Sequence, residues 1–365
     1  MKVLSLGVSM MHHEKISPIV SVIIATYNRG YLLNHVLEAL TNQTCDDFEV
    51  LMVVKPSGDG TEQIIETYRE RLNIKIIVQN HGYVTDALNL GLKHVKGEIF
   101  VFIDDDAIPF PNLIQAHILS YSEDTVGAVA GDVMPVILDG KKICQFTGVS
   151  SEIIPAKNSG SDLIRKLRHR PLKGLENYLF YISKAGFVSF NYDVADVARD
   201  NKIVYSLLAK GANMSVSSKA IADFQFPTSC IVGLTFEQQL AWYLWKKGYR
   251  VIFNPALKVY HIHHGQSLSR NIKDVKKKRV HCAENSLLFY RLHGSEPELS
   301  IMHRIVWLLI DPFIDIIKIC INKEFSRISM FKHKFFAELI GLRWLICKKL
   351  KLRYSPLVDL EKMLQ

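Results

Sequence analysis

The sequence lacks the signatures of several common classes of protein. Its six cysteines are scattered without a CxxC pair, which excludes a zinc motif and the disulfide framework of a small secreted domain. The first 18 residues are too interrupted by histidine and charge for a secretory signal. No GxxxxGK[ST] loop, GxGxxG or GxSxG pattern is present. We therefore expect a cytoplasmic protein that is neither a P-loop ATPase nor a dinucleotide-binding enzyme.

The chain also lacks an even distribution of charge. Its formal net charge is +9, yet residues 270–354 carry 18 Lys and Arg against 8 Asp and Glu, and the rest carries 27 against 28. The positive excess therefore belongs to the C-terminal segment, where it could face nucleic acid or an anionic membrane. The basic run Lys276–Arg279 has no interleaved aromatic residues, so we expect no nucleic-acid partner.

Strand and helix patterns alternate in the first third of the chain. Continuous β-branched apolar runs are typical of buried parallel strands, and apolar residues at helical spacing follow them. The series predicts an α/β fold with a Rossmann-like, mostly parallel sheet and helices on both faces. The expected strands are residues 19–25, 48–54, 74–78 and 99–103, with a strand pair at 251–260; helices follow near 32–40, after a capping Thr61, and near 85–94.

Three adjacent carboxylates, Asp104 to Asp106, end the fourth expected strand. Ligands of such sheets bind beyond the carboxyl ends of the strands. Neighbouring carboxylates repel one another unless a cation neutralises them, and hard oxygen ligands select Mg²⁺ or Mn²⁺. The pattern is consistent with a metal site, and equally with a solvated acidic turn.

Two later features carry candidate chemistry. His261, His263 and His264 follow the expected strand pair, and one imidazole could complete a carboxylate metal site. The alternative is that these are surface or core-capping histidines. Glu237 begins an aromatic helix, where it either favours the helix dipole or acts as a base whose pKa is raised by apolar surroundings.

Together these stretches resemble the family 2 glycosyltransferases of the GT-A fold. Five segments within residues 19–264 match that family in order: VSVIIATYNR, FEVLMVVKPSGDGTEQII, DALNLGLKHVKGEIFVFIDDD, GANMSVSS and FEQQLAWYLWKKGYRVIFNPALKVYH. The resemblance implies an inverting glycosyltransferase with Mg²⁺ or Mn²⁺ as cofactor. Such an enzyme moves a sugar from a nucleotide-sugar donor to a hydroxyl of a glycan, a polysaccharide or a lipid-linked sugar.

The resemblance also implies roles for individual residues. Asp104 and Asp106 match the DxD motif, in which the last Asp binds the metal and the first holds the metal or the ribose. Asp105 is the variable middle position. His261 matches a histidine that often completes the metal site. Glu237 takes the position of the catalytic base, although the acidic residue that precedes it in the family is absent here.

Further implied contacts lie on the nucleotide side of the site. They are Ala25, Tyr27, Lys55, Asp59 and Asn89, together with Asp104 and Asp105. Tyr27 matches an aromatic residue beside the nucleotide, and Asp59 matches the later Asp of the family's DDGSTDGT loop. The aspartates that open this loop, one of which usually reads the nucleobase, are Val54 and Lys55 here, so a uridine donor is not implied.

We expect three parts in the chain. These are an N-terminal extension at 1–18, a GT-A domain at 19–268 with a nucleotide-sugar half (19–130) and an acceptor half (131–268), and a basic helical extension at 269–365. Two apolar stretches of the extension, 301–321 and 335–350, are interrupted by charge, so neither is expected to span a membrane. They are expected either to lie peripherally on the anionic cytoplasmic face of a membrane or to pack on the catalytic domain.

Two other functions compete with glycosyl transfer. A nucleotidyltransferase would also hold a metal with aspartates on a parallel sheet, but it would carry a basic, glycine-rich loop after the first strand, which Ala25–Gly30 lacks. The second alternative is a non-catalytic homologue that binds sugar or nucleotide. The replacement of the family's two aspartates by Val54 and Lys55 is the observation that supports it.

Overall fold

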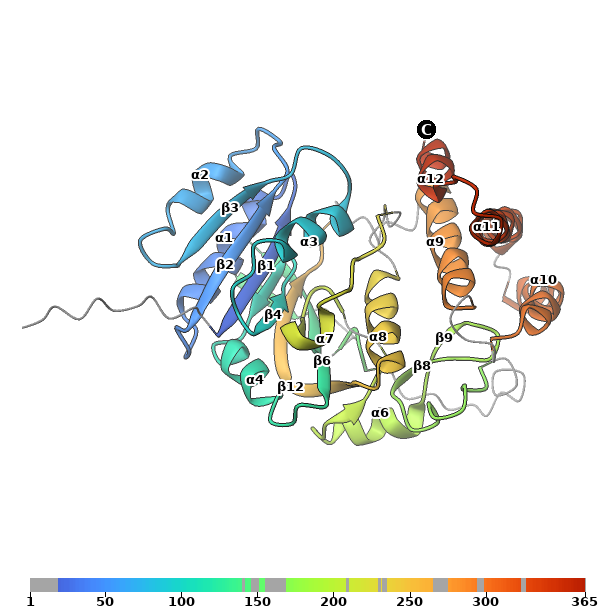
Figure 1. Cartoon of the computed structure of the whole chain (residues 1–365), viewed down its shortest axis with the longest axis horizontal. Helices are drawn as coiled ribbons and strands as arrows, with labels where there is room; N and C mark the ends of the chain where they lie inside the picture. Colours follow the sequence, from blue (N-terminus) through green and yellow to red (C-terminus); the bar gives the residue numbers. More distant parts are fainter. Residues whose placement is uncertain are drawn as a thin grey trace, which may run out of the picture.

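A ten-stranded mixed sheet lies at the centre of the protein (Figure 1). The computed structural model describes residues 19–139, 142–145, 151–154, 169–207, 210–228, 231, 235–264, 275–293, 299–322 and 326–364; the expected N-terminal extension lies outside them. The strand order is β10-β12-β6-β11-β4-β1-β2-β3, with β5 paired to β12 and β7 to β6. The strands are β1 (Val20–Thr26), β2 (Phe48–Val54), β3 (Ile74–Val78), β4 (Ile99–Phe102), β5 (Ala107–Pro109), β6 (Val126–Asp139), β7 (Lys142–Gln145), β10 (Val204–Tyr205), β11 (Met214–Ser217) and β12 (Arg250–Ile262).

The first four strands form the parallel part of the sheet, with β1 between β2 and β4 and with β3 outside β2. Their side chains alternate between two cores: Val22 and Ile24 face one, and Ile23 faces the other. Helices α1, α2, α4 and α6 cover the first face, and α3, α7 and α8 cover the second. The expected α/β fold with helices on both faces is thereby confirmed. The helices are α1 (Gly30–Thr41), α2 (Thr61–Glu66), α3 (Val84–Leu92), α4 (Leu113–Leu119), α6 (Tyr192–Arg199), α7 (Ser218–Ile221) and α8 (Phe236–Lys246).

The second half of the sheet differs from the sequence prediction. Strand β12 is one continuous strand, so the strand pair expected at 251–260 was wrong. Its pairing with β6 shifts register between Asn254 and Lys258, around Pro255, which has no amide hydrogen for the ladder. Strand β11 runs antiparallel between β4 and β6, and a separate hairpin joins β8 (Phe180–Ile182) to β9 (Val188–Phe190).

The C-terminal segment forms four helices, which lie together on the side of the molecule away from β3 (Figure 1). They are α9 (Val275–His293), α10 (Ile301–Asn322), α11 (Ser326–Lys349) and α12 (Pro356–Leu364). Leu288 and Phe289 of α9 join the core that α8 also lines, so this segment is packed against the sheet-containing part. In the part of the chain that the structure describes, no helix combines the length and the apolar character needed to cross a bilayer.

Candidate active site

The aspartate cluster and the histidines meet through strand pairing. Asp104 to Asp106 follow β4, and the chain continues directly into β5. Strand β5 is antiparallel to β12, with Ala107 opposite His261. This register places His261 beside the last aspartate, although 155 residues separate Asp106 from His261 in the chain. The cluster therefore lies at the carboxyl end of the parallel strands, where the sequence predicted a ligand site.

Asp104, Asp106 and His261 offer ligand atoms that all lie within 4.8 Å of one another. Nε2 of His261 is 3.0 Å from Oδ1 of Asp106 and 4.0 Å from Oδ2 of Asp104. Oδ1 of Asp106 is buried and receives no hydrogen bond of good geometry. Two carboxylates and one imidazole form a donor set that suits a divalent cation such as Mn²⁺. The residues present therefore fit the metal that the sequence led us to expect.

Two further side chains, those of Arg29 and His264, contact the buried aspartates. Nη1 of Arg29 donates to Oδ1 of Asp105 at 2.8 Å and to Oδ2 of Asp106 at 3.2 Å, and Nε2 of His264 lies 2.8 Å from the latter oxygen. Burial raises the pKa of Asp105 to about 6, against the opposing effect of Arg29. Burial also opposes ionisation of Asp106, but His261 and His264 lower its pKa well below the usual range. Arg29 was not singled out from the sequence, although it stands in the first matched segment.

Glu152 is a second residue that the sequence did not reveal. Its backbone N–H donates to the carbonyl of Val133 on β6, and Val133 is paired with Val259, two residues before His261. The Glu152 side chain therefore reaches the same end of β12. Oε2 of Glu152 lies 3.3 Å from Nδ1 of His261, Oε1 lies 3.1 Å from Nε2 of His263, and Lys210 forms an ion pair with the carboxylate.

Gly211 contacts Glu237 and lies close to Asp104 of the aspartate cluster. It is in the first turn of α8, and its Oε1 accepts a 3.3 Å hydrogen bond from the Gly211 N–H. A Cβ on Gly211 would be 3.6 Å from Oδ1 of Asp104 and 3.0 Å from the ring of Phe236, so the backbone approaches closely here. Burial raises the pKa of Glu237 to about 7. A carboxyl with this pKa is suited to accept a proton near neutral pH.

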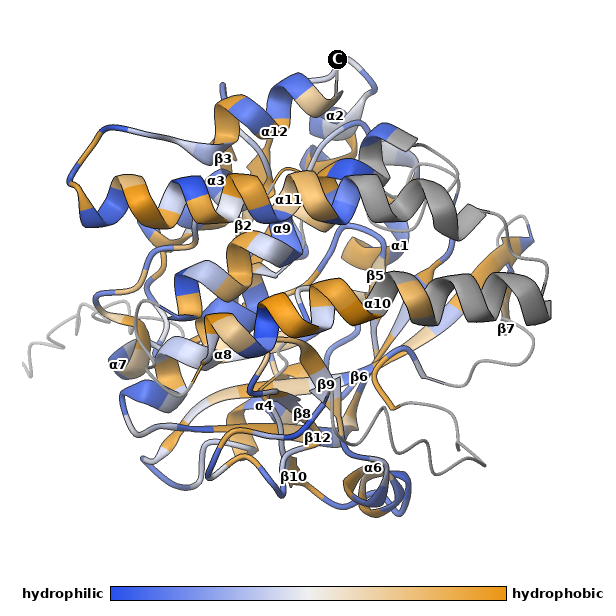
Figure 2. Ribbon diagram, turned by 90° about the vertical axis from the view of Figure 1, so that its right-hand side faces the viewer, coloured by the Kyte–Doolittle hydropathy of each residue, from blue (hydrophilic) through white to orange (hydrophobic). Residues whose placement is uncertain are grey.

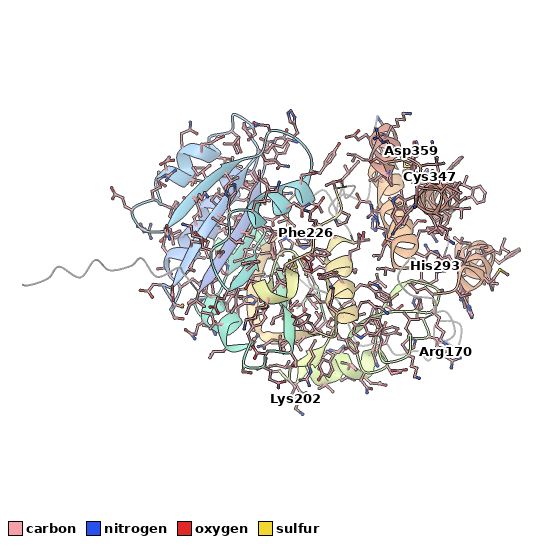
Figure 3. The ribbon with its side chains drawn as sticks, viewed as in Figure 1. Arg170, Lys202, Phe226, His293, Cys347 and Asp359 are labelled. Carbon is pink, nitrogen blue, oxygen red and sulfur yellow. The ribbon has the colours of Figure 1, made fainter. Side chains whose placement is uncertain are left out.

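Phe236 takes no part in this proton chemistry. It is buried against Phe226, with ring centroids 5.5 Å apart, and Phe226 in turn contacts Phe102 of β4 at 5.8 Å. Figure 3 labels Phe226 between the sheet and α8. The aromatic residue that stands where the family carries an acid thus anchors the start of α8 to the sheet.

Tyr27, Lys55 and Tyr83 form a cation–aromatic group in which Lys55 and Tyr83 are half-buried and Tyr27 is exposed. Nζ of Lys55 lies 5.3 Å from the ring centre of Tyr27 and 5.9 Å from that of Tyr83. The same ammonium donates to the carbonyl of Gly82 at 2.9 Å. Tyr27 is 58% exposed, so one ring at this edge is available to a ligand. Ala25 is the second-last residue of β1, just before this group, and is half-buried.

Asp59 and Asn89 make contacts that hold loops in place. Oδ2 of Asp59 accepts from the N–H of Gly30, and Oδ1 accepts from Ser57 and Thr61. These bonds lower the pKa of Asp59 to about 2, although burial opposes them. Asn89 exchanges two 2.8 Å hydrogen bonds with the backbone of Phe226. A role of either residue in donor binding stays a prediction.

The expected cap of α2 was wrong by one residue. Gly60, at φ +84°, occupies the N-cap position, and Thr61 is the first residue of the helix. A left-handed backbone favours glycine at this cap. Oδ1 of Asp59 accepts a 3.3 Å hydrogen bond from the Thr61 amide. The Asp59 carboxylate, and not the Thr61 hydroxyl, thus binds a free amide at the start of the helix.

Comparison with known proteins identifies the part of the chain that holds this site. A family model described as glycosyl transferase family 2 matches residues 21–148. The match covers about a third of the chain, and within these residues the chain is similar to that family. The matched residues include the Tyr27 turn, the Lys55 loop and the three aspartates, whereas Glu237 and His261 lie beyond them.

Two curated relatives illustrate how far the family 2 similarity extends. Poly(ribitol-phosphate) beta-N-acetylglucosaminyltransferase TarS of Staphylococcus aureus (strain MW2) is 38% identical over 222 residues, which cover 56% of this chain and 38% of TarS. Validoxylamine A glucosyltransferase of Streptomyces hygroscopicus subsp. jinggangensis (strain 5008) is 34% identical over 109 residues, 29% of this chain and 26% of that protein. The chain thus matches well under half the length of these relatives.

Solved structures support the GT-A fold. The mannosyltransferase PcManGT from Pyrobaculum calidifontis, in complex with GDP-Man and Mn²⁺, aligns with a TM-score of 0.51 at 18% identity over 96% of this chain and 85% of its own. GalNAc-T7 with UDP, GalNAc and Mn²⁺ aligns with a TM-score of 0.50 at 15% identity over 73% of this chain and 48% of its own. At these identities the likeness concerns the fold alone.

Proposed function

We propose that this protein is an inverting, metal-dependent glycosyltransferase that transfers a sugar from a nucleotide-sugar donor to an acceptor hydroxyl. The observation that carries the proposal is the cluster of Asp104, Asp106 and His261 within 4.8 Å, together with Glu237, which is hydrogen-bonded to Gly211 close to Asp104. The similarity to family 2 and the Mn²⁺ in the two aligned glycosyltransferase structures support it further.

The metal ligands and Glu237 have different roles in the proposed transfer. A bound Mg²⁺ or Mn²⁺, held by Asp104, Asp106 and His261, would act as a Lewis acid for the charge that develops on the departing diphosphate. The Glu237 carboxylate accepts the proton of the acceptor hydroxyl. The hydroxyl oxygen then bonds to the anomeric carbon as the bond from that carbon to the diphosphate oxygen breaks on the opposite face, which inverts the configuration.

Glu152 and Arg29 position the ligand groups in this proposal. When Nε2 of neutral His261 faces a metal, Nδ1 must carry the ring proton, and Oε2 of Glu152 is within 3.3 Å to accept it. Arg29 holds the carboxylates of Asp105 and Asp106 in place. Glu152 is therefore a positioning residue that fixes the His261 tautomer.

On the donor side, we propose that Tyr27 and Lys55 face the nucleobase. Lys55 can donate hydrogen bonds and accept none, whereas an aspartate at this position would accept them. The ammonium near two aromatic rings would therefore favour a base edge that presents carbonyl or ring-nitrogen acceptors. Uracil has carbonyl acceptors too, but Lys55 cannot accept a hydrogen bond from its ring N–H as an aspartate would, so no preference for uridine over other bases is expected.

For the acceptor, we propose a glycan or a lipid-linked sugar that is met on the cytoplasmic face of a membrane. The proposal includes a GT-A domain at 19–268, with donor and acceptor halves divided near residue 130, and a basic extension at 269–365. The 18 basic residues between 270 and 354 support an anionic surface as the partner of the extension.

A product assay tests the proposed function. Purified protein is incubated with Mn²⁺ and a panel of nucleotide sugars, and released nucleoside diphosphate is measured. Nucleoside diphosphate that appears with Mn²⁺ and not with EDTA is the expected result. Release of pyrophosphate in a parallel reaction with nucleoside triphosphates and sugar 1-phosphates would instead indicate a nucleotidyltransferase. Donor binding without turnover, whichever acceptor class is added, would indicate a non-catalytic homologue.

A further inference from the structure

Helices α10 and α11 expose apolar side chains at helical spacing. On α10 these follow one another at intervals of three and one residues, and on α11 mainly at intervals of three and four, so each set lies on one side of its helix. We call these twelve side chains the apolar face. They are Met302, Ile305, Val306, Leu309, Ile310 and Phe313 on α10, and Phe335, Phe336, Leu339, Leu342, Ile346 and Leu350 on α11.

The side chains of the apolar face are largely exposed to solvent. Leu309 is 65% exposed, Phe313 68% and Phe336 57%. Contiguous apolar patches of this kind mark interaction sites, because a helix that packs within a domain buries such a stripe. Figure 2 shows α10 and α11 running beside one another on the same side of the molecule, and Figure 1 shows that this side is remote from β3.

The opposite sides of the two helices hold them to the protein. Arg304 of α10 donates to Glu338 of α11 at 2.6 and 3.2 Å, and both side chains are buried. Arg304 also lies over the ring of Phe289 of α9 at 5.0 Å. Ala337 and Ile340 of α11 are buried in the core that α9 shares with α12. The apolar face is therefore held outward by a fixed packing arrangement.

Basic residues lie at one end of the apolar face. Lys348 and Lys349 end α11, and Lys351 and Arg353 follow it, all with exposed side chains. Among the described residues, none of these four cations forms an ion pair with a carboxylate. An apolar stripe beside solvated Lys and Arg is the composition of a helix that lies in the plane of an anionic membrane surface.

We propose that the apolar face, with the basic cluster of Lys348, Lys349, Lys351 and Arg353, docks on the surface of an anionic lipid bilayer. The proposal deepens the proposed function, because it names the surface through which the enzyme would meet a membrane-borne acceptor. The charge of the basic cluster favours a bilayer over a second copy of this chain as the partner. A second copy would bring its own basic cluster to the same interface, whereas anionic headgroups neutralise the cluster. The apolar side chains then enter the headgroup boundary.

Vesicle co-sedimentation of the full chain tests the docking surface. The wild type should sediment with vesicles of phosphatidylglycerol and phosphatidylcholine, stay in the supernatant with pure phosphatidylcholine, and be released by high salt. The double variant Leu309→Gln/Phe313→Gln should lower partitioning about tenfold, since two inserting side chains are lost. Substituting Lys348, Lys349 and Lys351 by Glu should abolish the preference for anionic lipid.

The matched controls are Leu119→Gln and Lys219→Glu, which change exposed residues on α4 and α7. Both controls should bind like the wild type, and all variants should melt alike. Failure of the wild type to bind anionic vesicles, or equal loss in controls and test variants, would overturn the proposal. So would a dimer in solution that Leu309→Gln/Phe313→Gln dissociates, which would assign the face to a second copy. Mn²⁺-dependent nucleotide binding without vesicles reports on the proposed function separately.

Discussion

Replacing Glu237 by Gln should impair catalysis and also stabilise the folded protein at alkaline pH. The catalytic effect follows from loss of the proton acceptor, and kcat should fall by about 10²- to 10⁴-fold. Donor binding should be nearly unchanged, because the Gln carbonyl can still accept the Gly211 N–H bond. The ratio of the effects on kcat and on donor Kd separates a base from a binding residue.

The stability effect follows from the raised pKa. Burial raises the pKa of Glu237 from 4.5 to about 7, so ionisation costs more in the folded state than in the unfolded chain. Folded stability therefore falls as pH rises from about 4.5 to about 7 and stays low above that. The whole cost is at most about 3 kcal/mol, at 1.36 kcal/mol for each pKa unit. Gln does not ionise, so Glu237→Gln should recover up to this amount at pH 8 and nothing at pH 4.

Urea unfolding of the wild type and Glu237→Gln across this pH range measures the difference directly. The metal is omitted, because a nearby cation would favour the ionised carboxylate. Glu123→Gln is the matched control, since Glu123 is 60% exposed in its ion pair with Arg250. A difference between wild type and variant that does not change with pH would refute the raised pKa. In the activity assay, which contains the metal, kcat/KM should fall about tenfold for each pH unit below the pKa of Glu237, and the nearby cation should bring that pKa below its metal-free value.

Three further predictions concern the metal and the donor. Asp106→Ala should abolish Mn²⁺-dependent transfer and Mn²⁺ binding while the far-UV circular dichroism spectrum stays unchanged. Full activity of this variant in EDTA would refute the predicted metal site. Glu152→Ala should weaken Mn²⁺ binding by about 10- to 100-fold through the freed His261 tautomer, and an unchanged calorimetric Kd would show that Glu152 acts elsewhere. Because Lys55 replaces an aspartate, we expect GDP and dTDP to compete for the donor site as well as UDP does. A clear preference of the wild type for UDP in a binding competition would contradict this prediction.

The parallel half of the sheet was predictable because its signals are local. Strands β1, β2 and β4 are buried on both faces, so each is a continuous apolar run, and the following helices repeat at helical spacing. Strand β6 has no such signal, because its sequence VGAVAGDVMPVILD mixes glycine, aspartate and proline with the apolar residues. It is stabilised by pairing with β11 and β12, which lie far along the chain. Pairing over such distances leaves no periodic trace in one sequence.

The same distinction separates the residues of the site. Asp104 to Asp106 are adjacent at a strand end, so the sequence alone brings them together. Contact between His261 and Asp106 depends on the β5–β12 register. In the sequence it was indicated only by the histidine cluster and by the resemblance to the family. Glu152 reaches His261 through a backbone hydrogen bond to β6, and no feature of its own neighbourhood in the sequence indicates this.

Asp59 and Asn89 each bond to nearby loops, whatever contact they make with a donor. The resemblance assigned both to donor binding, yet the Asp59 oxygens accept bonds from Gly30, Ser57 and Thr61, and Asn89 is bonded to the backbone of Phe226. These hydrogen bonds hold the Tyr27 turn, the loop before α2 and the segment at Phe226 in place. Lys55 lies in the loop that Asp59 holds, with its ammonium between two aromatic rings. Under the proposed function, Lys55 is therefore the residue whose substitution should change donor preference most.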